Sequence, residues 1–507
     1  MKFQLLSPSL PGSLVSILIP FLLAFVVESL DPSTTAADFV VIGGGTAGCT
    51  IAARLCQRLP WAHVVVLEQG GRRTAEQELV VKAMAYSNEL FDGLDPELVK
   101  SHPTEPNNAM LGRRISMREG MTVGGSSNIA LQWEIPLPGT VEEWGIDGLD
   151  AEMADYYYSK AAGVVRPQAP PVSLHQNYTQ DALNAYATAN FTVLANSSQI
   201  PKYGEDPGGE TSYINILAAD ETGSRRSSYT SYLEPILQQQ QQQSDVEDRS
   251  VCHLTLIEDA TVTELVFSNE TDPSSRVTAV KYVSSSHMSN NTAPSMMMIE
   301  VAKEVIVSAG PFGSPRLLQL NGIGPKEILE ERGVPAVRAD LPVGQKTQIR
   351  PLGVAVALYT GRPLDWANDP ELFNSEASRE QFLAGEGGPL GIALACAIGK
   401  MEENVGYHTL LFVDLGGRGP PTAAVACFSN PESFGNITII DGSNIMGSDL
   451  EIHSNLLDGP DFDNMVGCID RLIDVLPNGF PADFGMVAVG RENLTLSELV
   501  AATTSTS

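Results

Sequence analysis

The sequence predicts an α/β fold, and three neighbouring features near its N-terminus carry that prediction. Asp38–Ile42 (DFVVI) is a mostly apolar run, as expected for a buried parallel strand. A helix is expected from Thr46 to Leu59, because small residues open it and Pro60 ends it. His63–Leu67 (HVVVL) is a second apolar run. A strand, a helix and a strand within about thirty residues form a βαβ unit, which is the building block of α/β folds.

The turn between the first strand and the helix has the spacing G-x-G-x-x-G. The first glycine permits the tight turn, the second lets the backbone approach a pyrophosphate, and the third allows close helix–strand packing. Free amides at the helix N-terminus hold the phosphates, and an acid at the end of the second strand accepts hydrogen bonds from ribose hydroxyls. A glycine turn without a ligand would not need all these parts in register. The expected dinucleotide-binding residues are Gly43, Gly45, Thr46, Ala47, Gly48 and Glu68.

Composition narrows the class of protein. The 507 residues exceed one typical domain, and a hydrophobic share of 43% with 18% charged residues excludes wholesale disorder. Lys plus Arg number 31 and Asp plus Glu 61, a formal net charge of −30. A chain this acidic repels phosphate backbones and anionic membrane surfaces, so nucleic acid is not an expected partner. A small molecule is the expected one.

The N-terminus predicts secretion. Lys2 precedes an apolar run from Leu14 to Val27 that is too short to span a bilayer and contains Pro20. Residues 1–30 are therefore expected to be a signal peptide, with an uncleaved anchor as the alternative. No later stretch is apolar enough to span a membrane. Glycosylation of a secreted protein is expected at Asn-x-Ser/Thr sequons, which begin at Asn177, Asn190, Asn196, Asn269, Asn290, Asn436 and Asn493.

The six cysteines are too few for a disulfide scaffold. Cys49 and Cys56 share one face of the predicted helix and are expected to be buried thiols. The other four cysteines allow up to two disulfides with the pairing left open: Cys252, Cys396, Cys427 and Cys468. No His/Cys spacing typical of a metal site occurs in the sequence.

Two further segments have a predicted conformation. The six glutamines Gln238–Gln243 are interpreted as a loop expansion. A polar turn, Ser284–Ser295, separates two strand-like runs, Val277–Val283 and Met296–Val301. No internal repeat is present.

The opening DFVVIGGGTAGCTIAARL and the later VVVLEQGG resemble the first motif of the glucose–methanol–choline (GMC) oxidoreductases, which bind FAD, and most closely its plant-type mandelonitrile-lyase-like branch. Four more matches follow in the family's order, the last being the most specific: Arg118–Ala130, Trp144, Gly223–Leu233 and Glu304–Pro325. The resemblance runs from about Ala37 to Ile349 and, more weakly, from Asn430 to Ser497.

The resemblance implies further FAD-binding residues. Gly124, Gly125 and Ser126 would line the pyrophosphate and flavin, and bare amides beside small hydroxyls suit an anion. Val262 would contact the adenine through its backbone. Ser308, Ala309 and Gly310 would lie near the adenine end. The family's Asn-Ala is replaced by Ala130 and Leu131, so the expected amide contact is lost or is supplied by the nearby Asn128.

The fold that the resemblance implies is a discontinuous Rossmann-type FAD-binding domain with an inserted α+β substrate domain. The expected boundaries are 36–335 for the FAD-binding region, with part of the substrate domain inserted at about 144–220. Residues 336–429 continue the substrate domain, and 430–507 form a partial C-terminal region. The entry to the substrate domain, Gly344–Arg350 (GQKTQIR), departs from the family's pattern.

The family's catalytic base is a histidine in a C-terminal His-Pro-x-Gly-Thr motif, which removes the alcohol proton while hydride passes to the flavin. This chain has seven histidines, and none follows His453. The catalytic residue is therefore unassigned, and three explanations stay open: a truncated gene product, a member without the base, or a different base. The expected function is FAD-dependent oxidation of a CH–OH group. A hydroxynitrile-lyase-like enzyme and a non-catalytic FAD-fold protein are the alternatives.

Overall fold

The protein is described from a computed structural model, which defines the chain in segments. Residues 1–30, the predicted signal peptide, lie outside the described residues, as do the sequons at Asn196, Asn290 and Asn493. The described residues are 36–87, 90, 95–130, 145–169, 177–194, 210–214, 217–242, 252–269, 272, 274–284, 296–359, 375–391, 395–400, 407–412, 422–428, 431–444, 449–475 and 482–483.

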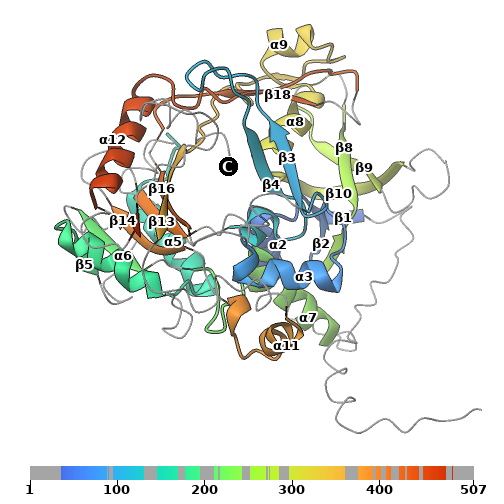
Figure 1. Ribbon diagram of the computed structural model, residues 1–507. Coiled ribbons are helices and arrows are strands. Elements are labelled where there is room, and N and C mark those ends of the chain that lie inside the picture. The colour runs from blue at the N-terminus through green and yellow to red at the C-terminus, as the bar shows by residue number, and fades with distance from the viewer. Residues whose placement is uncertain are drawn as a thin grey trace, which may run out of the picture.

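One body of the protein is built on a six-stranded sheet in the order β7-β2-β1-β10-β9-β8 (Figure 1). The first four strands run parallel, and β9 and β8 pair antiparallel at one edge. The strands and helix expected from the sequence are present, with ends that differ by a few residues. The strands are β1 Ala36–Ile42, β2 His63–Leu67, β7 His253–Ile257, β8 Ala260–Phe267, β9 Val277–Ser284 and β10 Met296–Val307.

Both faces of this sheet are buried, which explains why its parallel strands are almost wholly apolar. On one face Val41 and Val64 pack against helix α2 (Thr46–Arg58), whose small residues Ala52 and Ala53 let it approach closely. On the other face Val40 packs in a second core beneath helix α8 (Gly310–Leu320) and strands β8 and β9. The two helices that follow β1 and β10 therefore start at the same edge of the sheet.

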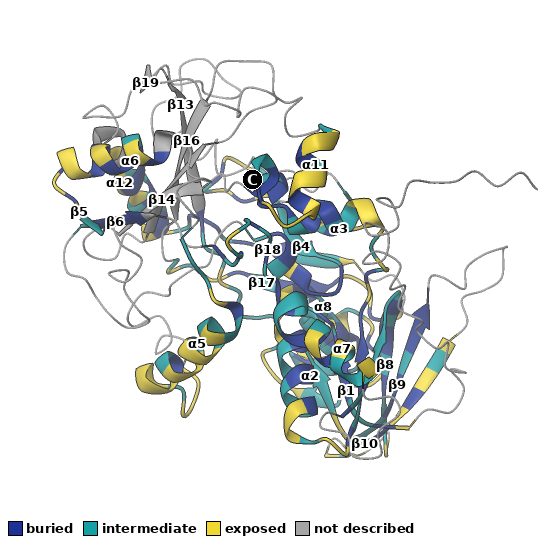
Figure 2. Ribbon diagram, turned by 90° about the horizontal axis from the view of Figure 1, so that it is seen from below, coloured by how far each residue is buried: buried dark blue, intermediate teal, exposed yellow. Residues whose placement is uncertain are grey.

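A second, seven-stranded sheet lies apart from the first, in the order β19-β13-β16-β15-β14-β6-β5 (Figure 2). It is mostly antiparallel and contacts helices α6 (Asn177–Thr188) and α12 (Pro460–Val475). Its strands come from distant parts of the chain: β5 Thr192–Leu194, β6 Thr211–Ile214, β13 Leu352–Tyr359, β14 Ala395–Lys400, β15 Tyr407–Phe412, β16 Thr422–Phe428 and β19 Ala482–Asp483. The exact domain boundaries stay a prediction.

The remaining elements lie outside the two large sheets. The hairpin β3–β4 (Val99–Pro103 and Ser116–Gly120) borders the first sheet. None of the described helices is long and apolar enough to cross a membrane. The other described α-helices and strands are α3 Ala75–Lys82, α5 Ala151–Val165, α7 Glu234–Gln242, α9 Lys326–Glu331, α11 Glu376–Leu383, β11 Ile323–Gly324, β12 Ala339–Asp340, β17 Asn436–Ile439 and β18 Leu450–His453.

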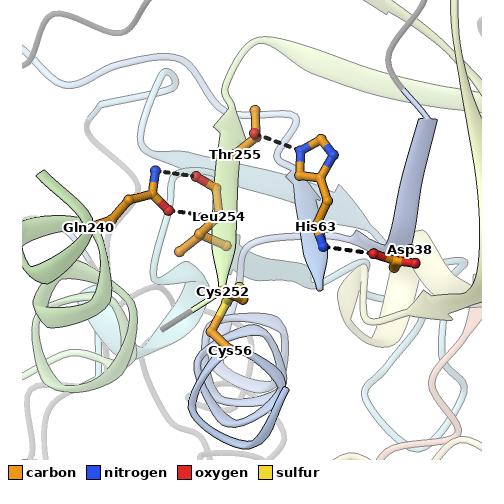
Figure 3. The surroundings of a disulfide bond; sticks show 7 residues. All are labelled: Asp38, Cys56, His63, Gln240, Cys252, Leu254 and Thr255. Carbon is orange, nitrogen blue, oxygen red and sulfur yellow. Dashed lines mark hydrogen bonds between the residues drawn. A yellow bond between two sulfur atoms is a disulfide. The ribbon is translucent and has the colours of Figure 1, made fainter. Parts of the chain in front are cut away.

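The structure corrects two predictions about the cysteines: the free thiol at Cys56 and the pairing of Cys252 with Cys396, Cys427 or Cys468. Cys56 is not a thiol, because it forms a disulfide with Cys252 across a sequence separation of 196 residues (Figure 3). Cys49 is a buried free thiol, as predicted. The helical spacing showed which face both cysteines share, but not that residue 252 meets this face just before β7. Cys468 is also disulfide-bonded, to a partner outside the described side chains.

The first five glutamines of the run are helical and do not form a loop, so that prediction was wrong for them; Gln243 lies outside the described residues. Gln238–Gln242 complete α7 because glutamine is a good helix former and extends a helix already begun at Glu234. The Gln240 amide also binds the edge strand β7: it accepts from Leu254 N at 2.6 Å and donates to Leu254 O at 3.1 Å (Figure 3). Tertiary contact thus gives one glutamine of the run a specific structural role.

Candidate functional site

A cavity of about 580 Å³ opens at the carboxyl ends of β1 and β2. Its walls are the first turns of α2 and α8, the hairpin β3–β4 and the start of β8. In open parallel sheets this edge is where ligands bind, and the volume is in the range of cofactor sites. Most of the predicted cofactor residues line the cavity: Gly43, Gly45, Thr46, Ala47, Glu68, Gly125, Ser126, Val262, Ser308, Ala309 and Gly310.

Three predicted residues, Gly48, Gly124 and Asn128, are not among the residues that line the cavity. At Gly48 a Cβ atom would overlap the carbonyl oxygen of Gly43 and lie 2.8 Å from the Ser308 hydroxyl. Gly48 therefore allows the close helix–strand packing expected of the third glycine. Gly48 thus packs against the residues that line the cavity without lining it.

Two glycine turns touch at the centre of the site. Gly124 N–H donates to the Gly44 carbonyl at 2.7 Å, and a Cβ on Gly125 would lie only 2.7 Å from Gly45 Cα. Gly124 and Gly125 have φ values of 100° and 53°, in the left-handed region that favours glycine. Contact between the two backbones therefore requires residues without side chains at this point.

Asn128 supports the second glycine turn from the protein interior. It is fully buried, and its Nδ2 donates to the Val123 carbonyl at 2.8 Å. A Cβ on Gly124 would lie 2.6 Å from that amide. The Asn128 Oδ1 has no hydrogen-bond partner among the described residues. The amide expected to reach the flavin thus packs behind the turn.

Two helix N-termini open into the cavity. Helix α2 begins after Gly45 and α8 after Ala309, and neither has a side-chain cap on its first amides. Thr46 and Ala47 are exposed at the start of α2. Uncapped amides and the positive end of the helix dipole favour an anion. A Cβ on Gly45 would meet only Gly125 Cα, at 3.8 Å, so the backbone here is open to a ligand.

Glu68 is buried at the end of β2, where its carboxylate faces the cavity. Its Oε2 accepts from Gly44 N at 2.8 Å and its Oε1 from Gly70 N at 2.9 Å. Burial raises the pKa of Glu68, and the two amide hydrogen bonds oppose that shift. These amides fix the orientation of the carboxylate, which keeps further lone pairs for ligand hydroxyls.

Four charged residues that line the cavity were not predicted as site residues, although two of them, Glu119 and Arg316, lie within matched motifs: Lys100, Glu119, Arg316 and Asp449. They come from β3, β4, α8 and the residues before β18. Burial lowers the pKa of Arg316, and the Asp449 carboxylate opposes that shift. No spacing rule connects residues on such distant elements, so only the folded chain reveals the group.

Two other residues that position the glycine turns were also missed. Arg73 donates from Nη1 to the Thr122 hydroxyl at 3.0 Å and to the Val123 carbonyl at 2.9 Å. Ser228 N–H donates to the Ser127 hydroxyl at 2.9 Å, next to the second turn. Ser228 belongs to a motif found in the sequence, which was a signal for it, whereas Arg73 had none beyond its place after β2.

No histidine with a described side chain lines the cavity. His63, His102, His253 and His453 all lie outside its lining. His175 and His287 fall outside the described residues, and the His408 side chain is not described. The structure therefore assigns no general base, as the sequence had left open.

The residues present fit the diphosphate and ribose of a dinucleotide. Bare backbone at Gly45 and Gly125 leaves room for close approach, and two helix N-termini favour the negative charge of the diphosphate. Glu68 supplies the carboxylate that ribose hydroxyls need. The cavity thus has the parts expected of an FAD site.

Comparison with protein families agrees with this fit. Residues 37–352 match the family model described as GMC oxidoreductase. This match confirms the predicted oxidoreductase family, whose cofactor is FAD. The finer assignment to the plant-type branch stays a prediction.

Two curated relatives are each 28% identical to the chain over the aligned residues. The GMC oxidoreductase family protein Mala s 12 of Malassezia sympodialis is 28% identical over 339 residues, covering 61% of this chain and 50% of that protein. The sinalpyl alcohol oxidase of Nesocodon mauritianus is 28% identical over 315 residues, covering 61% of this chain and 48% of that protein. The chain thus spans about half the length of these relatives.

Solved structures confirm the α/β fold. A formate oxidase superposes with a TM-score of 0.74 at 16% identity, covering 93% of this chain and 87% of that one. A fungal aryl-alcohol oxidase gives a TM-score of 0.67 at 17% identity, covering 93% of this chain and 88% of that one. At these identities the likeness establishes the architecture alone.

Proposed function

Because the chain belongs to the GMC oxidoreductase family, we propose that it is an FAD-dependent oxidoreductase acting on the CH–OH group of a small alcohol. The observation that carries the proposal is the cavity between two touching glycine turns, with two uncapped helix N-termini and Glu68 in its walls. One relative is named as an alcohol oxidase, which supports an alcohol as the substrate class.

The residues of the site divide the binding of FAD between them. The first amides of α2, at Thr46 and Ala47, hold the diphosphate, and Gly45 and Gly125 let it approach the backbone. Glu68 binds ribose hydroxyls, with its orientation fixed by Gly44 and Gly70. When bound, FAD supplies the hydride acceptor for alcohol oxidation. The chain itself supplies binding, orientation and a buried setting.

Purified protein tests the proposal directly. We expect a yellow protein whose bound flavin loses its visible absorbance when alcohols are added anaerobically. Free FAD with the same alcohols is the control for direct reaction. Protein that neither carries FAD nor takes it up would overturn the proposal. Bound FAD that no member of a broad panel of aliphatic and aromatic alcohols bleaches would favour a non-catalytic FAD-fold protein instead.

The same preparation separates the oxidoreductase from a lyase. We expect that alcohols reduce the bound flavin and that the same protein releases no cyanide from mandelonitrile. Cyanide release without bleaching of the flavin by alcohols would replace our proposal with a hydroxynitrile lyase of the plant-type branch. This assay therefore also tests the finer family assignment.

We further propose that the protein is secreted and glycosylated. The Cys56–Cys252 disulfide supports an oxidising compartment, and the sequon residues Asn190 and Asn269 are exposed. Asn436 is half-buried within β17 and is a poorer acceptor. Expression of the full chain in a eukaryotic host should yield glycoprotein in the medium whose mass falls after deglycosylation. Retention of an unmodified chain inside the cell would contradict this.

A further inference from the structure

A histidine–glutamate pair joins the two strands of the hairpin that borders the cavity. His102 lies on β3 and Glu119 on β4, and His102 Nε2 is 2.7 Å from Glu119 Oε1. The His102 residue is 8% exposed. A short contact between two largely buried polar groups is stronger than one at the surface. Glu119 lines the cavity, whereas His102 does not.

The same two residues contact helix α8. The His102 ring stacks on the Phe312 ring, with centroids 4.2 Å apart and an angle of 22° between the planes. A Cβ on Gly310 would lie 3.0 Å from Glu119 Oε2, so this carboxylate lies against the first turn of α8. A negative charge at a helix N-terminus is favourable. The pair thus attaches the hairpin to α8 at two points.

This attachment lies along one wall of the cofactor cavity. The hairpin contributes Lys100 and Glu119 to the lining, and α8 contributes Gly310 and Gly313. The Glu119 carboxylate is also near enough to Glu68 to raise the pKa of that group, although burial is the larger cause. Separation of the hairpin from α8 would therefore open the cavity to solvent on this side.

We propose that His102 and Glu119 are positioning residues that latch the hairpin β3–β4 onto helix α8 and so retain FAD in the cavity. The inference rests on the proposed function, because it assigns FAD to this cavity. His102 acts through Glu119 and Phe312 and is not among the lining residues. Loss of the latch raises the dissociation rate of FAD without altering the glycine turns.

The chain offers a matched control for the pair. His453 Nε2 lies 2.8 Å from Glu451 Oε1, in a second histidine–glutamate pair on β18. The His453 side chain is 41% exposed, against 9% for that of His102, and neither His453 nor Glu451 lines the cavity. The variant His453→Leu removes the same kind of contact without touching the proposed latch.

The test measures FAD release from the holoprotein by the rise in fluorescence of free flavin. We expect about tenfold faster release in His102→Leu and in Glu119→Gln, and wild-type release in His453→Leu. Because the two residues act together, the double variant should release FAD no faster than the His102→Leu single variant. Wild-type release in both single variants, or strictly multiplicative effects in the double variant, would overturn the latch.

Two further readouts separate the latch from general damage and from failure of the proposed function. Glu119→Gln keeps the shape of the side chain, so it covers the case in which His102→Leu does not fold. In the apoprotein of either single variant, amide hydrogen exchange in the hairpin should be faster than in the wild type, whereas exchange in α2 should be unchanged. Unchanged hairpin exchange in the variants would contradict the latch, whether or not the wild type binds FAD. Failure of the wild type to bind FAD would overturn the proposed function instead.

Discussion

The backbone amide of Gly124 donates a hydrogen bond to the carbonyl of Gly44 across 2.7 Å, which ties the second glycine turn to the first. The two turns come from segments far apart in the chain, and each contributes residues to the lining of the cavity, Gly43 and Gly45 from the first and Gly125 from the second. The geometry of each turn therefore depends on the other. Glycine substitutions in the two turns can therefore be tested for their effect on FAD affinity and, separately, on the stability of the apoprotein.

Replacing Gly45 by alanine should impair FAD binding more than folding. Gly45 has a φ of −77°, which alanine adopts freely, and the new Cβ would meet only Gly125 Cα at 3.8 Å. The methyl group would stand where the diphosphate approaches the backbone. We expect at least tenfold weaker FAD binding in a titration, with apoprotein stability within about 0.5 kcal/mol of the wild type.

The control for this substitution is Gly163→Ala in helix α5, where a Cβ meets nothing within 4 Å. It should leave FAD affinity unchanged and raise stability slightly, since alanine favours helix over glycine. Wild-type FAD affinity in Gly45→Ala would show that the diphosphate does not lie against the first turn of α2.

The stability of the apoprotein should depend on pH through Glu68. Burial raises the pKa of this carboxyl above its ordinary value of 4.5, so the folded state holds the proton more tightly than the unfolded state. The contribution of Glu68 to the free energy of unfolding is fully present below about pH 4.5 and is lost as the pH rises through the higher pKa of the folded state.

Urea unfolding at a series of pH values measures this contribution. In Glu68→Gln the free energy of unfolding should decline less with rising pH across that window, because the amide does not titrate. Identical pH dependence in the variant and the wild type would show that the pKa of Glu68 is not raised.

Removal of the Cys56–Cys252 disulfide should lower stability. The bridge closes a sequence separation of 196 residues, so cutting it restores much chain entropy to the unfolded state. We expect Cys56→Ala/Cys252→Ala to lose about 2–5 kcal/mol in chemical unfolding.

Mutation isolates this bridge, whereas a reductant would also break the disulfide at Cys468. The single variant Cys252→Ala serves as the control and should lose nearly as much as the double variant, because either change removes the bridge. A double variant with wild-type stability would contradict the pairing.

Substitution of Arg225 should lower the free energy of unfolding more than most substitutions outside the cavity. Burial lowers its pKa to about 10, so it stays charged at neutral pH. It donates to the Val81 carbonyl at 2.9 Å, to the Ser87 hydroxyl at 2.7 Å and to the Ala130 carbonyl. Arg225→Met would leave these buried acceptors without their donor and should cost about 3 kcal/mol or more.

The neighbouring Arg226 provides the comparison. It is half-buried and makes a longer hydrogen bond, to the Val165 carbonyl at 3.4 Å. Arg226→Met should cost less than about 1 kcal/mol in the same unfolding assay. Equal losses in the two variants would show that the buried hydrogen bonds of Arg225 are not what stabilises the fold.

The parts of the site that the sequence predicted share one property, which is that local rules govern them. The strand Asp38–Ile42, the helix from Thr46 and the acid Glu68 follow from periodicity, glycine spacing and chain order. The structure places these residues around one cavity. Neighbours in the chain are enough to specify them, because a βαβ unit is a local structure.

The failures have the opposite origin. Cys56 was expected to be a buried thiol because it shares a helix face with Cys49. Helical spacing did not reveal its partner, Cys252, which lies far along the chain. The glutamine run was expected to be a loop, yet Gln240 binds the edge of β7. Likewise no sequence rule connects His102 with Phe312. Each of these contacts exists only after the sheet has assembled.

By itself the sequence determined the α/β class, the oxidoreductase family and the glycine turn at Gly43–Gly48, because these depend on residue types at fixed local spacing. The tertiary structure alone decided which distant segments complete the cavity, among them the hairpin that carries Glu119 and the start of α8. The physical reason is that packing and hydrogen bonding act between atoms close in space, wherever those atoms lie along the chain.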